Sequence, residues 1–268
     1  MRITIDGRPL DVADGTTILE ACREEDIEIP TLCFLETLEP ANACRLCVVE
    51  VEGSASLVPS CSREAVEGMV ISTDSERVRH SRRMVLELLA ATSDLSNAGL
   101  DRMIESYGAK PDRLHLTAAG REPEIDNSLY MRDLDRCVLC FRCVDVCGEQ
   151  AQNTFAITVA GRGGTAYIAT EFDVPLPDSA CVFCGNCVAI CPTGALTSLA
   201  EFEMRRQGTW DEALQQITLT VCPFCGVGCN LELYVQDNRI VKVTSPLNHD
   251  VTSGNLCIKG RYGFEHVE

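Results

Sequence analysis

The chain is best understood from residues 137–147, Cys137-Val138-Leu139-Cys140-Phe141-Arg142-Cys143-Val144-Asp145-Val146-Cys147, whose spacing is C-x2-C-x2-C-x3-C. Residues 181–192 repeat the spacing and end in proline: Cys181-Val182-Phe183-Cys184-Gly185-Asn186-Cys187-Val188-Ala189-Ile190-Cys191-Pro192. Such runs are typical of proteins with two 4Fe-4S clusters, in which three thiolates of a run bind one cluster and the fourth binds the other. The expected ligand sets are Cys137, Cys140, Cys143 and Cys191 for one 4Fe-4S cluster, and Cys147, Cys181, Cys184 and Cys187 for the second.

A zinc ribbon and disulfide bonds are two other possible uses of these cysteines. A zinc ribbon needs two C-x2-C pairs, which would leave four of the eight cysteines without a ligand role. Disulfides form in oxidising compartments, and residues 1–4 do not begin an apolar signal segment. Two complete runs therefore favour iron-sulfur clusters, and crossed ligation would hold the two clusters close enough for electrons to pass between them.

Composition limits the classes of function. The 268 residues include 17 cysteines, and 40 Asp and Glu outnumber 23 Lys and Arg, which gives a formal net charge of −17. Ligation requires thiolates, so the assembled protein should be more negative still, and nucleic acid is not expected as a partner. The sequence has no apolar run long enough to span a membrane and no twin-arginine leader, so the cytoplasm is the expected compartment.

The N-terminal segment has the pattern of a small β domain. The expected elements are a hairpin over residues 2–5 and 10–12 with a turn at Asp6-Gly7, a helix over 17–25 capped by residues 14–16, and strands at 48–51 and 69–73. This order is that of a β-grasp domain. Four of its cysteines are spaced C-x10-C-x2-C-x13-C, which suits a 2Fe-2S cluster, with a zinc site as the alternative: Cys33, Cys44, Cys47 and Cys61.

One cysteine of this segment is left over. Cys22 falls on the apolar face of the expected helix, together with Ile18 and Ala21. A thiol in that position is more often packed in the core than used as a ligand or nucleophile. We therefore expect sixteen of the seventeen cysteines to bind clusters.

The C-terminal segment carries a fourth cysteine set. A helix over residues 201–216 with a break near Gly208 should lead to a strand at 217–221 and a hairpin over 231–235 and 240–243, turning at Asp237-Asn238. The cysteines flank the hairpin as C-x2-C-x3-C and a fourth after 27 residues: Cys222, Cys225, Cys229 and Cys257. A zinc site with four cysteine ligands would be credible if the set stood alone, but beside the two other cluster motifs a further iron-sulfur cluster is favoured.

A glycine-rich stretch between the two runs partly matches a nucleotide-binding motif. Residues 161–166 fit G-x-G-x-x-A after the β-like residues 154–159, but residues 167–170 form a second strand pattern where the dinucleotide fingerprint needs a helix. A hairpin turn is the better interpretation. We also found no Walker loop and no flavin-binding unit in the sequence.

Several of these motifs resemble known families. The N-terminal segment resembles the N-terminal domain of the large iron-sulfur subunit of respiratory complex I. Three stretches carry the resemblance: Ile29-Pro30-Thr31-Leu32-Cys33, Asn42-Ala43-Cys44-Arg45-Leu46-Cys47-Val48-Val49-Glu50-Val51-Glu52-Gly53 and Gly68-Met69-Val70. Iron hydrogenases and NAD-linked formate dehydrogenases share that domain. In several of these families the double-cluster cassette follows it, so the resemblance covers nearly the whole chain.

The C-terminal set resembles the small cluster domain that opens molybdopterin oxidoreductases such as formate dehydrogenase. In them a lysine just after the last cysteine lies between the 4Fe-4S cluster and the pterin, and Lys259 matches that position. The sequence ends eleven residues after Cys257, so we expect no pterin domain in this polypeptide and no pterin for Lys259 to contact.

One departure from these families concerns residues 76–128. Relatives usually bind a further 4Fe-4S cluster through one histidine and three cysteines just after the helix that we expect at 76–91, whereas this chain has no cysteine between Cys61 and Cys137. His80 and His115 are isolated, and lone histidines usually occupy surface or capped positions. The same helix carries a row of basic residues, which we interpret as a solvated face or, alternatively, a docking site for an acidic partner: Arg77, Arg79, Arg82 and Arg83.

The sequence thus predicts an α+β, multidomain chain. The expected parts are a 2Fe-2S β-grasp ferredoxin domain at 1–75, a helical connector that has lost its cluster at 76–128, a double 4Fe-4S ferredoxin-like domain at 129–213 and a small 4Fe-4S β domain at 214–268. One 2Fe-2S and three 4Fe-4S clusters are expected, without molybdopterin or flavin.

The expected function is electron relay, similar to that of short subunits of NAD(P)H-linked hydrogenases and ferredoxin-dependent transhydrogenases. Its partner would be a flavoprotein subunit with an NAD(P)H site, together with ferredoxin and a further catalytic subunit. Two other hypotheses are the cluster-bearing piece of a split molybdopterin enzyme and a redox sensor that signals by losing a cluster. Four clusters are more than a sensor needs.

Overall fold

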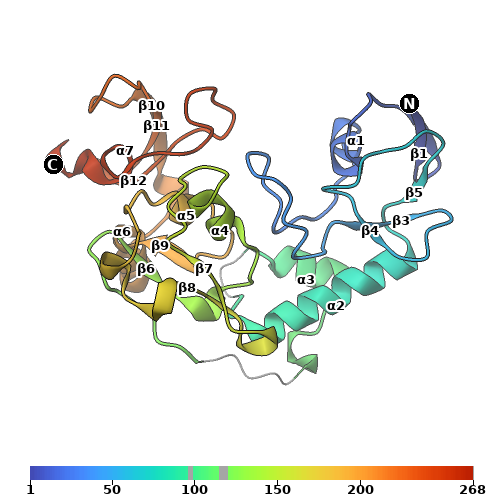
Figure 1. The fold of residues 1–268 in the computed structure, drawn as a ribbon, viewed down its shortest axis with the longest axis horizontal. Coiled ribbons are helices and arrows are strands. Elements are labelled where there is room, and N and C mark those ends of the chain that lie inside the picture. Colours follow the sequence, from blue (N-terminus) through green and yellow to red (C-terminus); the bar gives the residue numbers. More distant parts are fainter. Residues whose placement is uncertain (96–98, 115–119, 268) are drawn as a thin grey trace. The chain divides into compact units, whose positions relative to one another are not determined.

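The computed structural model describes residues 1–95, 99–114 and 120–267, and it combines helices with small β-sheets (Figure 1). The chain divides into two units. The N-terminal unit comprises Met1–Phe34, Pro40–Ala119 and Val138–Cys140, and the C-terminal unit comprises Leu35–Glu39, Gly120–Cys137 and Phe141–Glu268. Within the described residues, no helix has the length and apolar character needed to cross a membrane.

A five-stranded mixed sheet forms the core of the N-terminal unit, in the order β2-β1-β5-β3-β4. Its strands are β1 (Arg2–Ile5), β2 (Arg8–Asp11), β3 (Val48–Val51), β4 (Val58–Pro59) and β5 (Val70–Ser72). The pair β1 and β5 is parallel and the other pairs are antiparallel, as a β-grasp requires. Asp6 and Gly7 both have positive φ, 49° and 80°, so the first hairpin closes with the primed turn that the sequence predicts.

Helix α1 (Ile18–Glu24) packs its apolar face on this sheet, and Cys22 is fully buried there beside Ile3 and Ile5. Burial raises the pKa of the Cys22 thiol to about 12, so it stays protonated and serves packing. The predicted cap was wrong in detail. Thr17, not residues 14–16, caps the helix: its hydroxyl accepts from the Glu20 amide while the Glu20 carboxylate accepts from the Thr17 amide.

A long helix follows the sheet. Helix α2 (Glu76–Thr92) begins at the Ser75 cap, and α3 (Asp101–Tyr107) ends at Gly108, whose φ of 63° suits a helix end. Buried Leu32, Leu46 and Leu86 form the core between α2 and the cysteine loop. The described part of the predicted connector therefore packs on the preceding cysteine-bearing segment.

The predicted basic patch on α2 is wrong in its central member. Arg82 is only 2 % exposed and donates hydrogen bonds to the carbonyls of Leu46 and Val48, each at 3.0 Å. These two residues flank Cys47, so Arg82 clamps the main chain at a predicted cluster ligand. The outer arginines are also engaged: Arg77 with Glu50 and Arg79 with Asp74. Helical spacing alone did not reveal that Arg82 faces inward.

Short elements build the first part of the C-terminal unit: β6 (Tyr130–Arg132), α4 (Arg142–Cys147), β7 (Thr158–Ala160), β8 (Tyr167–Ala169), α5 (Asn186–Ala189), β9 (Leu196–Ser198) and α6 (Leu199–Gln207). Strand β6 precedes the first cysteine run and pairs antiparallel with β9, which follows the second. The two runs are thereby closed into one loop-rich body. Among the described residues of both units, 3-10 turns are formed by Pro111–Arg113, Leu134–Arg136, Gly163–Thr165, Glu171–Asp173, Leu176–Asp178, Glu212–Leu214 and Gly263–Val267.

The glycine-rich stretch at 161–166 is a hairpin turn, as the sequence analysis favoured. It joins the antiparallel strands β7 and β8 through a 3-10 turn at Gly163–Thr165. Gly161 has a φ of 73°, and a Cβ there would overlap the Thr165 carbonyl. The glycine is therefore needed for the turn itself.

A three-stranded antiparallel sheet ends the chain, with β10 (Gln216–Val221), β11 (Asn230–Gln236) and β12 (Arg239–Thr244) in sequence order. Asp237 and Asn238, at φ 52° and 62°, form the predicted turn. The helix predicted over 201–216 is shorter, because α6 ends at Gly208 in the left-handed conformation and only a 3-10 turn separates it from β10. The last helix is α7 (Ile258–Tyr262).

The Arg82 clamp generates a stability prediction. Arg82→Ala should leave the carbonyls of Leu46 and Val48 without their donor in a buried setting, at a cost of about 3 kcal/mol. Native-state hydrogen exchange of the amides in β3 and α2 should accelerate roughly a hundredfold. Arg83→Ala is the matched control, because Arg83 contacts the exposed His80 and its loss should cost less than about 0.5 kcal/mol. Equal exchange rates in the two variants would contradict the clamp.

Candidate metal centres

The four cysteines predicted for the 2Fe-2S cluster lie in two pairs. The Cys33 amide donates to Cys44 Sγ at 3.4 Å, and the Cys44 amide donates to Cys33 Sγ at 3.5 Å. Cys47 Sγ and Cys61 Sγ are 3.3 Å apart. In a 2Fe-2S cluster with four thiolates each iron takes two of them, so two pairs of sulfurs fit the donor set of such a cluster.

The loop around these cysteines favours thiolates. Asn42 and Arg45 adopt left-handed conformations, with φ of 55° and 60°, so the backbone turns sharply on either side of Cys44. The hydrogen bond from the Cys33 thiol lowers the pKa of Cys44 to about 6, and the pairing with Cys61 lowers the pKa of Cys47 to about 7. In each pair one thiol thus favours the thiolate form of its neighbour, which is the form that binds iron.

The two repeated runs share one backbone conformation. Leu139 and Phe141 in the first run have φ of 50° and 67°, and the corresponding Phe183 and Gly185 in the second have 55° and 71°. Phe141 and Gly185 each precede a helix, α4 and α5 respectively. The sequence repeat is therefore also a structural repeat, in which each run turns twice and then enters a short helix that ends near its fourth cysteine.

Cys147 lies close to the second run. Helices α4 and α5 pack on each other, and Val146 joins a small apolar cluster with Cys187. Burial raises the pKa of Cys187 most, and the neighbouring thiols of Cys184, Cys181, Cys147 and Cys191 raise it further. Cys147 therefore lies near the run with which we predict it to bind a cluster, and Cys191, which we predict for the other cluster, also neighbours Cys187.

The C-terminal cysteines come together at one end of the three-stranded sheet. The Cys222 amide donates to the Cys229 carbonyl at 2.8 Å, and both side chains contact the apolar core formed by Leu231 and Val243. Burial raises the pKa of Cys229, and Cys222, Cys225 and Cys257 add to the shift. Cys257 is the N-cap of α7, and Lys259, which we predict to lie near the C-terminal cluster, is exposed on that helix. Four neighbouring thiols at a loop end fit a 4Fe-4S cluster.

No three His, Cys, Asp or Glu side chains are grouped around a single-ion position in residues 1–95, 99–114 and 120–267. Of the two isolated histidines, His80 lies with its Nδ1 2.8 Å from Arg83 Nη2, whereas His115 lies outside the described residues. Residues 96–98, in the segment where the resemblance implies a further cluster, lie outside the described residues.

Sequence reasoning missed several residues beside the second run. Tyr130, which is 2 % exposed, has its hydroxyl 3.1 Å from Cys181 Sγ. Arg261 and Asn186, also buried, are hydrogen-bonded to each other at 2.9 Å. These residues are 51 or more positions away in sequence from their partners, and no local pattern links them.

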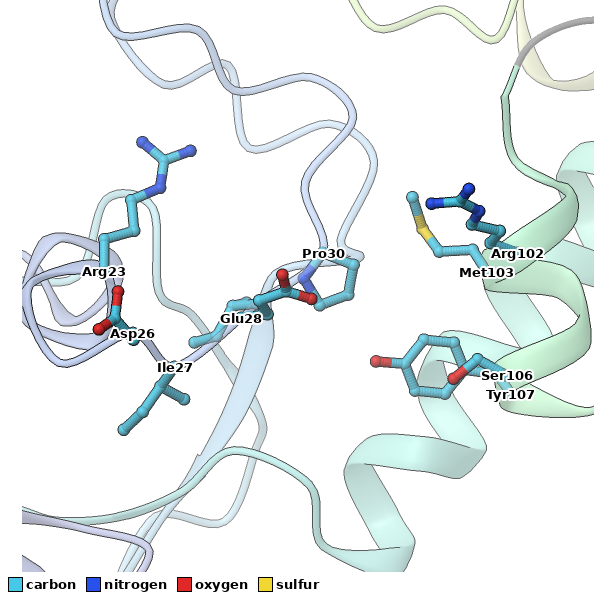
Figure 2. Close-up of a pocket in the computed structure, with 10 residues that line it drawn as sticks. Arg23, Asp26, Ile27, Glu28, Pro30, Arg102, Met103, Ser106 and Tyr107 are labelled. Atoms are coloured by element: carbon cyan, nitrogen blue, oxygen red, sulfur yellow. The ribbon is translucent and has the colours of Figure 1, made fainter.

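The N-terminal unit also contains a cavity of about 610 Å³ beside the loop that leads to Cys33. Figure 2 shows Arg23, Asp26 and Glu28 on one side of it and Met103 and Tyr107, from α3, on the other. Its lining mixes both signs of charge with apolar groups. No local sequence pattern predicts this cavity, because its walls come from separate segments.

Comparison with protein families identifies three iron-sulfur segments. Residues 1–76 match the 2Fe-2S iron-sulfur cluster binding domain, and residues 128–197 match the ferredoxin-like domain of NADH-quinone oxidoreductase subunit 3. Residues 215–268 match the Fe4S4 domain of molybdopterin oxidoreductases. The resemblance inferred from the cysteine motifs is thereby confirmed.

Individual relatives span several enzymes. The chain is 37% identical to the NADPH-Fe(3+) oxidoreductase subunit alpha of Geobacter sulfurreducens, over 99% of this chain and 31% of that protein. It is 38% identical to the NADP-reducing hydrogenase subunit HndD of Solidesulfovibrio fructosivorans, over 73% of this chain and 36% of that one. The chain thus spans about a third of the length of these relatives.

A solved structure is also similar. A chain of the NAD+-reducing [NiFe]-hydrogenase in its H2-reduced state superposes with a TM-score of 0.66 at 27% identity. The match covers 74% of this chain and 87% of that one. Most of this chain therefore shares a fold with a chain of that hydrogenase.

The proximity of Cys147 to the second run generates a test of the crossed sets. Cys147→Ser should alter the EPR signal of the cluster that also depends on Cys184, whereas Cys191→Ser should alter the signal that depends on Cys137. Cys22→Ser is the control and should leave all cluster signals unchanged, because Cys22 is packed in the core. If each run instead kept all four of its own cysteines on one cluster, the two variants would show the opposite pairing.

Proposed function

We propose that this chain is an iron-sulfur electron-transfer subunit of a multi-subunit NAD(P)H-linked oxidoreductase, relaying single electrons to and from a flavoprotein partner. One observation carries the proposal: sixteen of the seventeen cysteines fall into four sets with cluster spacing, within three segments that match iron-sulfur families. The seventeenth, Cys22, is buried in an apolar core.

The proposed ligand sets follow the four domains. We assign Cys33, Cys44, Cys47 and Cys61 to a 2Fe-2S cluster in residues 1–75, and residues 76–128 to a connector without a cluster. Residues 129–213 would hold two 4Fe-4S clusters, on Cys137, Cys140, Cys143 and Cys191 and on Cys147, Cys181, Cys184 and Cys187. Residues 214–268 would hold a third, on Cys222, Cys225, Cys229 and Cys257. The paired sulfurs at Cys33 and Cys44 and at Cys47 and Cys61 support the two-iron assignment.

Clusters of these types accept and release one electron at a time. The chain's own residues fix where that happens. The left-handed residues Leu139 and Phe141, repeated at Phe183 and Gly185, turn the backbone between the first three cysteines of each run. The packing of α4 on α5 holds the two runs together.

The partners that we propose are a flavoprotein subunit with an NAD(P)H site, ferredoxin and a further catalytic subunit, in the cytoplasm. A flavin takes two electrons from a hydride together and can release them singly, which is the task that a one-electron relay leaves to its partner. The relatives that reduce or oxidise NADP or NAD support this arrangement.

A second candidate is the cluster-bearing piece of a split molybdopterin enzyme such as a formate dehydrogenase. The match of residues 215–268 to the Fe4S4 domain of molybdopterin oxidoreductases favours it, as does the exposure of Lys259 two residues after Cys257. Metal analysis of the native complex separates the two candidates. The split molybdopterin enzyme would contain both iron and molybdenum, whereas the relay complex would contain iron but no molybdenum.

The ligand sets predict the metal content. Anaerobically purified chain should contain about 14 iron atoms and as much acid-labile sulfide, from one two-iron and three four-iron clusters. A chain that reproducibly held about 18 iron atoms would have the extra cluster of its relatives, and the proposed loss of that cluster would be wrong.

The relay role predicts what the chain does alone. With its clusters loaded, it should be reduced by dithionite but should not oxidise NADH, NADPH or formate, and oxidation should begin when the flavoprotein partner is added. The assay follows cluster bleaching in the visible spectrum under anaerobic conditions. Rapid NADH oxidation by the flavin-free chain would reveal a nucleotide site and contradict the relay.

A further inference from the structure

Helix α7 follows Cys257 directly but makes its polar contacts at the second cysteine run. Arg261 Nε donates to the Cys184 carbonyl at 3.0 Å, and Arg261 Nη2 donates to Asn186 Oδ1 at 2.9 Å. The same amide oxygen accepts from the Leu256 amide at 2.9 Å. The C-terminal segment is therefore tied to the loop Cys184-Gly185-Asn186 from two sides.

Arg261 brings a buried positive charge to this loop. It is 4 % exposed, and its three acceptors are neutral: the carbonyls of Cys184 and Val243 and the amide oxygen of Asn186. Burial lowers the pKa of Arg261, while Tyr262 and the thiols of Cys184, Cys187 and Cys257 oppose that shift. A buried cation is stable only when an opposite charge compensates it, and a cluster held by four thiolates is an anion.

Tyr262 places a second polar group at the same loop. Its hydroxyl is buried and has no hydrogen-bond acceptor among the described residues. It lies against Gly185, where a Cβ would overlap the Tyr262 hydroxyl and approach Arg261 Cδ to 2.6 Å. A buried hydroxyl without a partner costs free energy, so one expects an acceptor at this position in the assembled protein.

The contact made by the neighbouring Tyr130 indicates a cysteine sulfur as the acceptor. The Tyr130 and Tyr262 rings stack with their centroids 6.5 Å apart and their planes at 19°. The Tyr130 hydroxyl already contacts a cysteine sulfur of this run, Cys181 Sγ, at 3.1 Å. Burial raises the pKa of the Tyr262 phenol most; Arg261 opposes that shift, and the thiols of Cys187, Cys184 and Cys181 lie near enough to add to it, so the hydroxyl stays a donor.

We propose that Tyr262 donates a hydrogen bond to a sulfur of the cluster on Cys147, Cys181, Cys184 and Cys187, and that Arg261 is the buried counter-charge of that cluster. Reduction adds one negative charge, so a nearby cation and a hydrogen-bond donor both favour the reduced form and raise the potential. Helix α7 of the C-terminal segment thus sets the potential of a cluster in the adjoining cassette. The inference rests on the proposed ligand set.

The test is an anaerobic potentiometric titration of the full cluster-loaded chain, followed by EPR. Cys184→Ser first identifies the signal of this cluster as the one that it perturbs. Tyr262→Phe should then lower the ratio of reduced to oxidised cluster at a fixed potential about fivefold, which equals a negative shift of about 40 mV at about 59 mV per tenfold. Arg261→Gln should shift the same signal further, by about tenfold or more.

Matched controls separate this effect from a general loss of structure. Tyr234→Phe removes a phenol hydroxyl from β11, and Arg206→Gln removes an exposed cation from α6 that pairs with Glu203. Both should leave the titration unchanged. Tyr262→Phe keeps the ring and its stacking on Tyr130, so it stays informative even if Arg261→Gln fails to assemble clusters.

Three outcomes would overturn the proposal. The first is an unshifted titration in Tyr262→Phe. The second is a shift confined to the signal that Cys229→Ser perturbs, because α7 would then act on the C-terminal cluster alone. In both cases the relay function would stand. If Cys184→Ser altered no EPR signal, the ligand set would fall, and this inference with it.

Discussion

Bringing cysteine sulfurs together in loops is the requirement on which the rest of this structure depends. In the C-terminal unit the described helices have four to nine residues and the strands three to seven, so little apolar surface is available to hold the chain. Repeated left-handed turns and the β6 and β9 pair instead hold the cysteines in place. The N-terminal unit has a larger core, and there the paired sulfurs lie at its edge, with Cys47 and Cys61 among the core residues.

Buried arginines stabilise this arrangement at two separate sites. Arg82 donates to the carbonyls on both sides of Cys47, and Arg261 donates to the carbonyl of Cys184 itself. Each fixes the main chain at a proposed ligand, and Arg261 also places a positive charge near the Cys184 sulfur, which must be anionic to bind iron. Acidic side chains, which are in excess in this chain, cannot compensate the negative charge of thiolates.

The sequence predicted the parts of the structure that depend on local patterns. Cysteine spacing indicated the four sets, and Asp6-Gly7 and Asp237-Asn238 indicated turns that the structure contains. It did not distinguish Arg82 from its exposed neighbours on α2, because which side of a helix faces inward depends on what packs there. Nor did it reveal that Tyr262 contacts the second cysteine run at Gly185. That contact depends on the tertiary fold, which brings the neighbouring Arg261 to Cys184, 77 positions earlier in the sequence. Two-residue β4 was missed because pairing with β3, not propensity, defines it.

Mössbauer spectroscopy of the chain loaded with iron-57 tests the central claim most directly, because it counts iron by cluster type. In the oxidised state about one-seventh of the absorption should come from the ferric pair of a 2Fe-2S cluster, and the rest from 4Fe-4S clusters. A spectrum without the ferric pair, or one dominated by mononuclear iron, would contradict the assignment of the cysteines to one two-iron and three four-iron clusters.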